Sequence, residues 1–178
     1  MKRTLALLAA TTVLALSACG KASETAAEKM IESQIGKDGT QAKVDLSGGG
    51  MKITTTDASG KVSQMEMGTA KVSEADIGLP FYPGTQPREG EMMKVSTPEG
   101  STVTVTLRSD DAPAKVAGFY RDKLKAQADG KQFSEMSSAD AHLLILADDK
   151  SNQLTQVTVA KGGMGSDIQI MAHRTTGK

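Results

Sequence analysis

The strictest pattern in the chain is the alternation of residues 101–109. Within it, residues 102–107 alternate strictly between threonine and an apolar residue: Thr102, Thr104 and Thr106 alternate with Val103, Val105 and Leu107. Successive side chains of a strand point to opposite faces, so we expect a strand with one face in a core and the other in solvent. Pro98-Glu99-Gly100 predicts a hairpin turn from a strand over 92–97. The threonine face is either a polar binding ladder or simply the solvated side of the sheet.

The segment after this hairpin predicts one helix and then four strands. Asp110-Asp111 followed by Ala112-Pro113 is typical of a helix start, and Gly130 of its end, so we expect a helix over 112–128. Its apolar stripe is Val116, Phe119, Tyr120 and Leu124. The expected strands are 132–136, 141–147, 154–160 and 167–173. Residues 142–147 are apolar on both faces, which favours a central strand covered on both sides. This order predicts an α+β fold, an antiparallel sheet with one main helix packed on it.

The N-terminal part predicts a helix followed by a small β-meander, together spanning residues 23–70. Ser23 can cap a helix over 23–35, and Gly36 can end it. Val44 and Leu46 alternate with Lys43 and Asp45 in the first short strand. Strands over 51–55 and 62–67 follow, separated by turns at 48–50 and 57–60. The meander has few large apolar residues, so we expect a helix or the later domain to cover it.

A proline-rich stretch, residues 71–91, separates the meander from an α+β domain at 92–174. It contains Pro80, Pro83 and Pro87. Proline fixes its own φ and pushes the preceding residue toward extended geometry, so we expect an ordered, extended connector. Phe81 and Tyr82 should dock on a neighbouring surface.

The first residues, 1–18, have the parts of a secretory signal peptide: Lys2 and Arg3, about 13 uncharged residues, then small residues. A bilayer-spanning helix needs about 20 apolar residues, and no later stretch is apolar enough. Leu16-Ser17-Ala18-Cys19 resembles the lipobox of bacterial lipoproteins. The resemblance implies that Cys19 becomes the first mature residue and carries lipid, with residues 19–22 as a short spacer. An ordinary secreted protein with an incidental cysteine is the alternative.

The same resemblance predicts the location. Lipoproteins retained at the inner membrane carry aspartate after the cysteine, and here that residue is Gly20. We therefore expect the outer membrane, facing the periplasm, rather than the inner membrane or the cell surface.

The charge and cysteine content of the mature chain exclude two further features. Losing Lys2 and Arg3 leaves 19 basic against 21 acidic residues, a net charge of −2, which argues against binding of nucleic acid. With Cys19, the only cysteine, committed to lipid, no disulfide can form.

Residues 78–173 resemble a domain of uncharacterised bacterial lipoproteins and secreted proteins. The resemblance lies in Pro80-Phe81-Tyr82-Pro83-Gly84, the hairpin, the helix with Phe119-Tyr120-Arg121-Asp122-Lys123-Leu124, and the strands that follow. It implies fold and location only, because no activity is assigned to that family.

Candidate catalytic groups are few. There is no Gly-x-Ser-x-Gly elbow, and the two histidines, His142 and His173, are expected at opposite ends of the sheet. The pairs Asp110-Asp111 and Asp148-Asp149 lie where turns and helix caps favour aspartate, and a cation site is the alternative. The glycines at 48–50 and 162–165 match no nucleotide-binding pattern, so we expect turns. We therefore predict no enzyme activity and no cofactor beyond lipid on Cys19.

The methionines suggest copper binding as an alternative chemistry. Met65 and Met67 share a strand face, and Met92 and Met93 are adjacent; thioethers suit Cu(I), but methionine is also flexible core filler. The sequence thus predicts a lipoprotein acting as a non-catalytic accessory through an envelope protein, cell-wall polymer or lipidic ligand. The alternatives are a copper-binding protein using Met65, Met67, Met92 or Met93, and a hydrolase.

Overall fold

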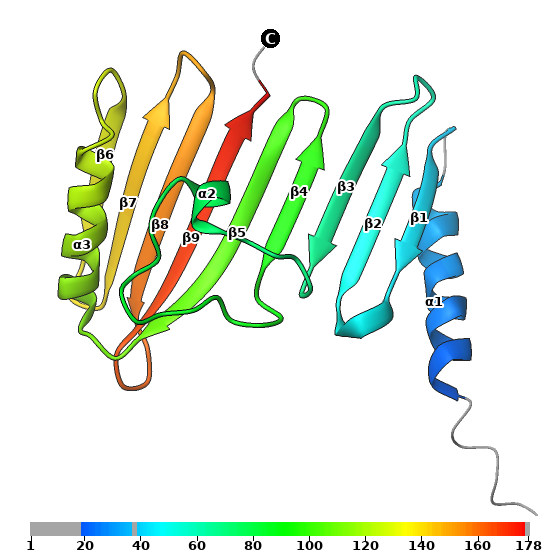
Figure 1. Ribbon diagram of the computed structural model, residues 1–178, viewed down its shortest axis with the longest axis horizontal. Helices are drawn as coiled ribbons and strands as arrows, with labels where there is room; N and C mark the ends of the chain where they lie inside the picture. Colours follow the sequence, from blue (N-terminus) through cyan, green and yellow to red (C-terminus); the bar gives the residue numbers. More distant parts are fainter. Residues whose placement is uncertain (1–18, 37–38, 177–178) are drawn as a thin grey trace, which may run out of the picture.

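A computed structural model describes residues 19–36 and 39–176 of the protein (Figure 1). Its main element is one antiparallel sheet with the strand order β1-β2-β3-β4-β5-β9-β8-β7-β6. The strands are β1 (Gln41–Asp45), β2 (Met51–Thr56), β3 (Val62–Met67), β4 (Met93–Thr97), β5 (Gly100–Ser109), β6 (Gln132–Ser137), β7 (Ala141–Asp148), β8 (Gln153–Lys161) and β9 (Ser166–Thr175). Because β3 pairs with β4, the predicted meander and the predicted 92–174 domain share a single sheet.

Helices occupy a small part of the described chain. They are α1 (Cys19–Ile35), α2 (Glu74–Ile77), α3 (Pro113–Lys125) and the 3₁₀ turn η1 (Ser47–Gly49). The antiparallel sheet and the main helix near 112–128 are confirmed. The prediction of an α+β fold is only partly right, since nine strands make the described chain mostly sheet. Neither α2 nor η1 was predicted, because each is too short to show a helical period.

The core lies on one face of the C-terminal half of the sheet, which we call the covered face. Directly opposed residues of antiparallel strands point to the same face, so the apolar set of β5 continues through β9 and β8 to β7. Its fully buried members include Val105, Leu107, Leu144, Val157, Val159, Ile168 and Ile170. Val116, Tyr120 and Leu124 of α3 pack against them. Burial of these side chains supplies the main driving force for folding.

The connector (residues 68–92) also crosses the covered face (Figure 1). The prediction that it is extended is only partly right, because α2 forms within it. A capping box between Ser73 and Asp76 starts α2, and α2 packs on β5 and β9. Tyr82 is buried, and its ring meets that of Phe119 edge-on at 5.2 Å. The Tyr82 hydroxyl donates a hydrogen bond to Asp111 Oδ2 at 2.6 Å. The expected docking of Tyr82 is therefore confirmed, and Phe81 packs at the margin of the same core.

Helix α1 begins at Cys19, so the prediction of a spacer over 19–22 and a helix start at Ser23 is wrong; the end at Ile35 is confirmed. Ser23 was expected as a cap, but the residues before it have helical geometry already. Glu32 Oε1 accepts a hydrogen bond from Val44 N at 2.8 Å, and Glu28 Oε1 one from Leu46 N at 3.0 Å. These carboxylates occupy backbone donors on the outer edge of β1, where an unpaired edge would otherwise be exposed.

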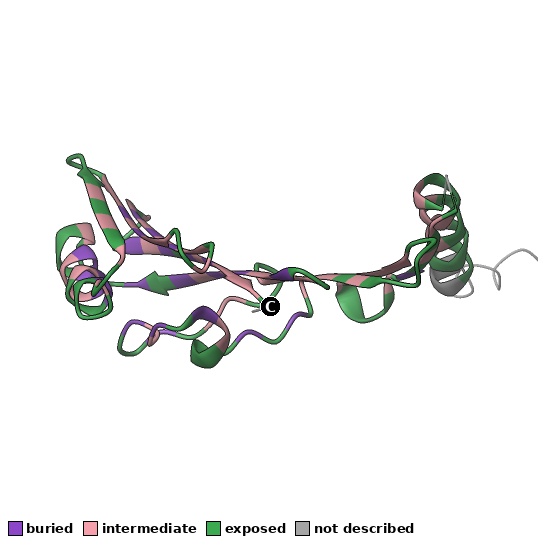
Figure 2. Ribbon diagram, turned by 90° about the horizontal axis from the view of Figure 1, so that it is seen from above, coloured by how far each residue is buried: buried purple, intermediate pink, exposed green. Residues whose placement is uncertain are grey.

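Strand β7 is not central, so the prediction that it is covered on both sides is wrong. It is next to the last strand, β6, at one end of the sheet. Leu144 and Leu146 are buried under α3, whereas Leu143 and Ile145 on the other face are only half-buried. Figure 2 shows no described helix on that other face at this end of the sheet. Its continuous apolar sequence therefore reflects one core face and one open apolar face.

Candidate functional site

The described elements leave most of the face opposite α3 and the connector uncovered, and we call it the open face. Only α1 lies against it, at the β1 end, where Val44 is buried. Figure 2 shows α1 and the connector on opposite sides of the sheet. The threonines of the 101–109 alternation lie on this face and are half-buried. The Thr102 hydroxyl and His173 Nδ1 share a hydrogen bond of 3.0 Å across β5 and β9.

Strand register gathers methionines at one place on the open face. Met51 of β2 is directly opposite Met67 of β3, and Met67 is directly opposite Met93 of β4. We call these three residues the methionine row. Met65 lies on the same face two residues from Met67, opposite Ile53 and Val95. Met67 is 40% exposed, and Met51 and Met93 are half-buried.

The methionine set predicted from the sequence is only partly brought together. Met65, Met67 and Met93 share the open face, but Met92 does not belong with them. It precedes β4, is half-buried and packs against the core under the covered face, which separates it from Met93 despite their adjacency in sequence. Met51 was missed. Its alternation with Ile53 and Thr55 placed it on the face of Ile53, but the register that sets it beside Met67 is not visible in the sequence.

A polar hollow of about 440 Å³ lies on the covered face, beyond the apolar core. Its lining residues are Gln64, Glu66, Thr69, Lys71, Lys94 and Ser96. Lys94 Nζ donates to Asp76 Oδ1 at 2.9 Å, and Lys52 Nζ pairs with Glu66 at 2.8 Å. Hydrogen bonds from Ser73, then from Lys94, lower the pKa of Asp76 to about 2. Two of the three charged residues of this hollow, Lys94 and Glu66, thus join the connector to β4 and β2 to β3.

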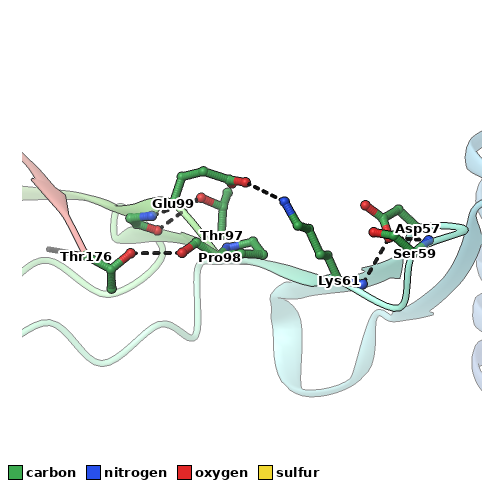
Figure 3. Close-up of polar contacts among 8 residues, drawn as sticks. Asp57, Ser59, Lys61, Thr97, Pro98, Glu99 and Thr176 are labelled. Atoms are coloured by element: carbon green, nitrogen blue, oxygen red, sulfur yellow. Dashed lines mark hydrogen bonds and ion pairs between the residues drawn. The ribbon is translucent and has the colours of Figure 1, made fainter. Parts of the chain in front are cut away.

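A second hollow, of about 680 Å³, lies at the end of the sheet where the β2–β3 and β4–β5 turns meet the chain after β9. We call it the distal hollow, because α1 begins with Cys19 at the opposite end (Figure 1). Its lining includes Lys61, Pro98, Glu99, Lys150, Gln153 and Thr176. Lys61 Nζ is 3.3 Å from Glu99 Oε1, and the Thr176 hydroxyl donates to the Pro98 carbonyl at 2.9 Å. Figure 3 shows both contacts. These contacts hold its rim together.

The histidines are far apart. His142 of β7 is directly opposite Val159 of β8, and Val159 is directly opposite Ile168 of β9. His173 comes five residues after Ile168, so the two residues are on the order of 16 Å apart along β9. His142 shares the covered face with Val159, whereas His173 lies on the open face. His142 Nδ1 contacts the Ser137 hydroxyl at 2.9 Å. The two imidazoles therefore cannot act on one substrate atom within this fold.

Asp111 and Asp148, one from each aspartate pair, have structural partners. Asp111 accepts hydrogen bonds from Tyr82 and from Lys115 Nζ, and these lower the pKa of its carboxyl, Lys115 being the larger cause. Asp148 Oδ1 accepts from the backbone N–H groups of Lys150 and Ser151, forming the β7–β8 turn. Within residues 19–36 and 39–176, no three His, Cys, Asp or Glu residues are grouped as ligands of a metal ion.

Cys19 is the first residue of α1, and residues 1–18, with the predicted signal peptide, lie outside the described residues. None of the described helices is long and apolar enough to cross a membrane. Comparison of the chain with known protein families, curated proteins and solved structures gave no match. Both resemblances noted in the sequence therefore remain predictions.

Proposed function

We propose that the protein is a lipoprotein of the outer membrane, anchored through lipid on Cys19, whose periplasmic sheet acts as a non-catalytic accessory by binding another envelope component. The observation that carries this proposal is the direct connection between the predicted lipid site and the sheet. α1 begins at Cys19 without a spacer, and Glu28 and Glu32 attach it to the edge of β1.

This connection would fix the position of the sheet relative to the bilayer. The 17 residues of α1 span about 25 Å at about 1.5 Å per residue. A lipid-modified Cys19 would hold one end of the sheet at the membrane surface, since two or more acyl chains bind stably. The distal hollow and the open face would then stand out into the periplasm, where a membrane protein or cell-wall polymer could reach them.

Fractionation of cells tests the anchor. We expect the wild-type protein to stay with membranes after a high-salt wash, and Cys19→Ser to be released as a soluble protein. A Ser23→Ala variant, changed four residues further along α1, serves as the matched control and should fractionate like wild type. A Cys19→Ser protein that remains membrane-bound after the wash would contradict the anchor.

Site-specific photo-crosslinking tests the accessory role. A photoreactive residue at Gln169, exposed on the open face, or at Gln153, in the distal hollow, should give a discrete adduct in cells. The control position is Lys123, on the helix that covers the other face. Adducts at none of these positions, or equal adducts at all three, would overturn the role.

A further inference from the structure

We propose that the methionine row, Met51, Met67 and Met93, binds one soft monovalent metal ion of the Cu(I) class through its three thioether sulfurs. This goes beyond the accessory role and does not depend on it, because the row is built by the register of β2, β3 and β4 alone.

The geometry allows the three sulfurs to converge. Neighbouring strands lie about 4.8 Å apart, and directly opposed residues have Cβ atoms about 4.5–5.5 Å apart on the same face. Met67 is in the middle of the row, with Met51 and Met93 one strand away on either side. Methionine has three rotatable side-chain bonds, so the outer two thioethers can turn toward the central one. Met65, two residues along β3, is a fourth soft donor within reach.

The surroundings select for a soft ion of low charge. Lys52, Glu66 and Lys94 alternate with the methionines along the three strands and therefore point to the covered face, where they form ion pairs. The neighbours of the row on the open face are Ile53, Val95 and Thr104, which carry no charge. Neutral thioethers favour Cu(I) and offer no oxygen ligands to hard cations such as Mg²⁺ or Ca²⁺.

Packing does not account for the row. Methionine fills gaps in cores, but no described helix or strand covers these three side chains, and Met67 is 40% exposed. Leucine or valine would serve equally well on a half-exposed strand face. The row lies at the strand ends next to Gly50 and Gly68, so an ion can reach it from solvent.

Methyl spectroscopy tests the site directly. The sample is the full-length protein carrying Cys19→Ser, extracted from cells, so that no thiol competes for the metal. It is titrated first with Ag(I) and then with Cu(I) kept reduced with ascorbate. With ¹³C-methyl-labelled methionine, we expect the signals of Met51, Met67 and Met93 to shift and to saturate at one ion per chain. Met92, Met136 and Met164 should not shift; Met164, 93% exposed, reports non-specific binding.

Competition with a chromophoric Cu(I) chelator tests the same residues by affinity. Met67→Leu, which keeps the apolar volume, should weaken Cu(I) binding at least about tenfold, the least that supporting changes around metal sites cost. Met92→Leu is the matched control, next to Met93 in sequence but on the other side of the sheet, and should bind within about twofold of wild type. Circular dichroism checks that both variants fold.

Two results would overturn the proposal. The first is a Met51→Leu/Met67→Leu/Met93→Leu protein that binds Cu(I) as tightly as wild type. The second is a methyl shift spread evenly over Met30, Met92 and Met164 without saturation, which would mean adventitious thioether binding only. Loss of membrane anchoring in Cys19→Ser has no bearing on either measurement, so the failure of the two proposals can be told apart.

Discussion

The ion pair between Arg121 of α3 and Glu135 of β6 holds the last strand of the sheet to the helix. Arg121 donates from Nε to Oε2 at 2.7 Å and from Nη2 to Oε1 at 2.5 Å. β6 has a sheet partner on one side only, β7. We predict that Arg121→Met destabilises the protein at neutral pH, and that this loss disappears in acid.

The size of the expected loss of stability follows from the pKa of the Glu135 carboxyl. The hydrogen bonds from Arg121 are the main cause that lowers the pKa of Glu135 from 4.5 to about 2. One pKa unit corresponds to about 1.36 kcal/mol, which sets an upper limit of about 3 kcal/mol. The two side chains are 32% and 21% exposed, and solvent screening reduces the expected contribution to about 1–2 kcal/mol. Because the folded pKa is the lower one, the contribution is complete above about pH 5 and is lost as the pH falls toward 2.

Urea denaturation at about pH 7, about pH 4.5 and about pH 3 measures this difference between wild type and Arg121→Met. Wild type should be more stable by about 1–2 kcal/mol at the first pH and by clearly less at the last. Arg88→Met is the control. Its ion pair with Glu91 lies at an exposed place on the connector and should contribute less than about 0.5 kcal/mol. A loss in Arg121→Met that stays constant from pH 7 to pH 3 would refute the electrostatic reasoning and leave packing of the arginine stem as the cause.

Three further predictions concern the core, a close backbone approach and the sheet edge. Leu107→Ala, at a fully buried position, should lower the free energy of unfolding by about 2–4 kcal/mol in urea denaturation. Thr106→Ala on the open face should lower it by less than about 1 kcal/mol. Equal losses would mean that the open face is also packed. Gly165→Ala should lower the melting temperature, because a Cβ there would lie 2.1 Å from the Ser109 carbonyl oxygen, whereas Gly163→Ala meets nothing within 4 Å and should melt like wild type. Replacing Glu28 and Glu32 with alanine should speed amide hydrogen exchange at Val44 and Leu46 without affecting β5; unchanged exchange there would show that the carboxylates do not protect the β1 edge.

The strands of this fold could be predicted closely because each is an interval of alternation between turn residues. Val62–Met67 was predicted with the bounds that the structure has, and the others within a few residues. Element type depends on the period of side chains along the chain, which is local information. An ordered connector could be predicted from local information too, because each proline restricts the backbone dihedrals at and just before its own position.

Partners across the sheet were not predictable. Residues 142–147 are apolar on both faces, yet β7 lies next to an end of the sheet, because strand order depends on pairing between distant segments. Arg174 is another case: its Nη2 donates to the Ile77 carbonyl at 2.9 Å, across 97 residues of sequence. Burial lowers the pKa of this guanidinium, an environment that nothing near position 174 indicates.

The sequence by itself predicted the strands, which the structure confirms, and an anchor at Cys19 and few catalytic groups, which stay predictions. These depend on residue type and local spacing. Only the tertiary structure decided that both halves form one sheet, that Met92 lies apart from Met93, and that Met51 joins Met67. The physical reason is register: a shift of one residue between two strands would turn every side chain to the other face, and the register is set by burial of the whole apolar set, not by any single segment.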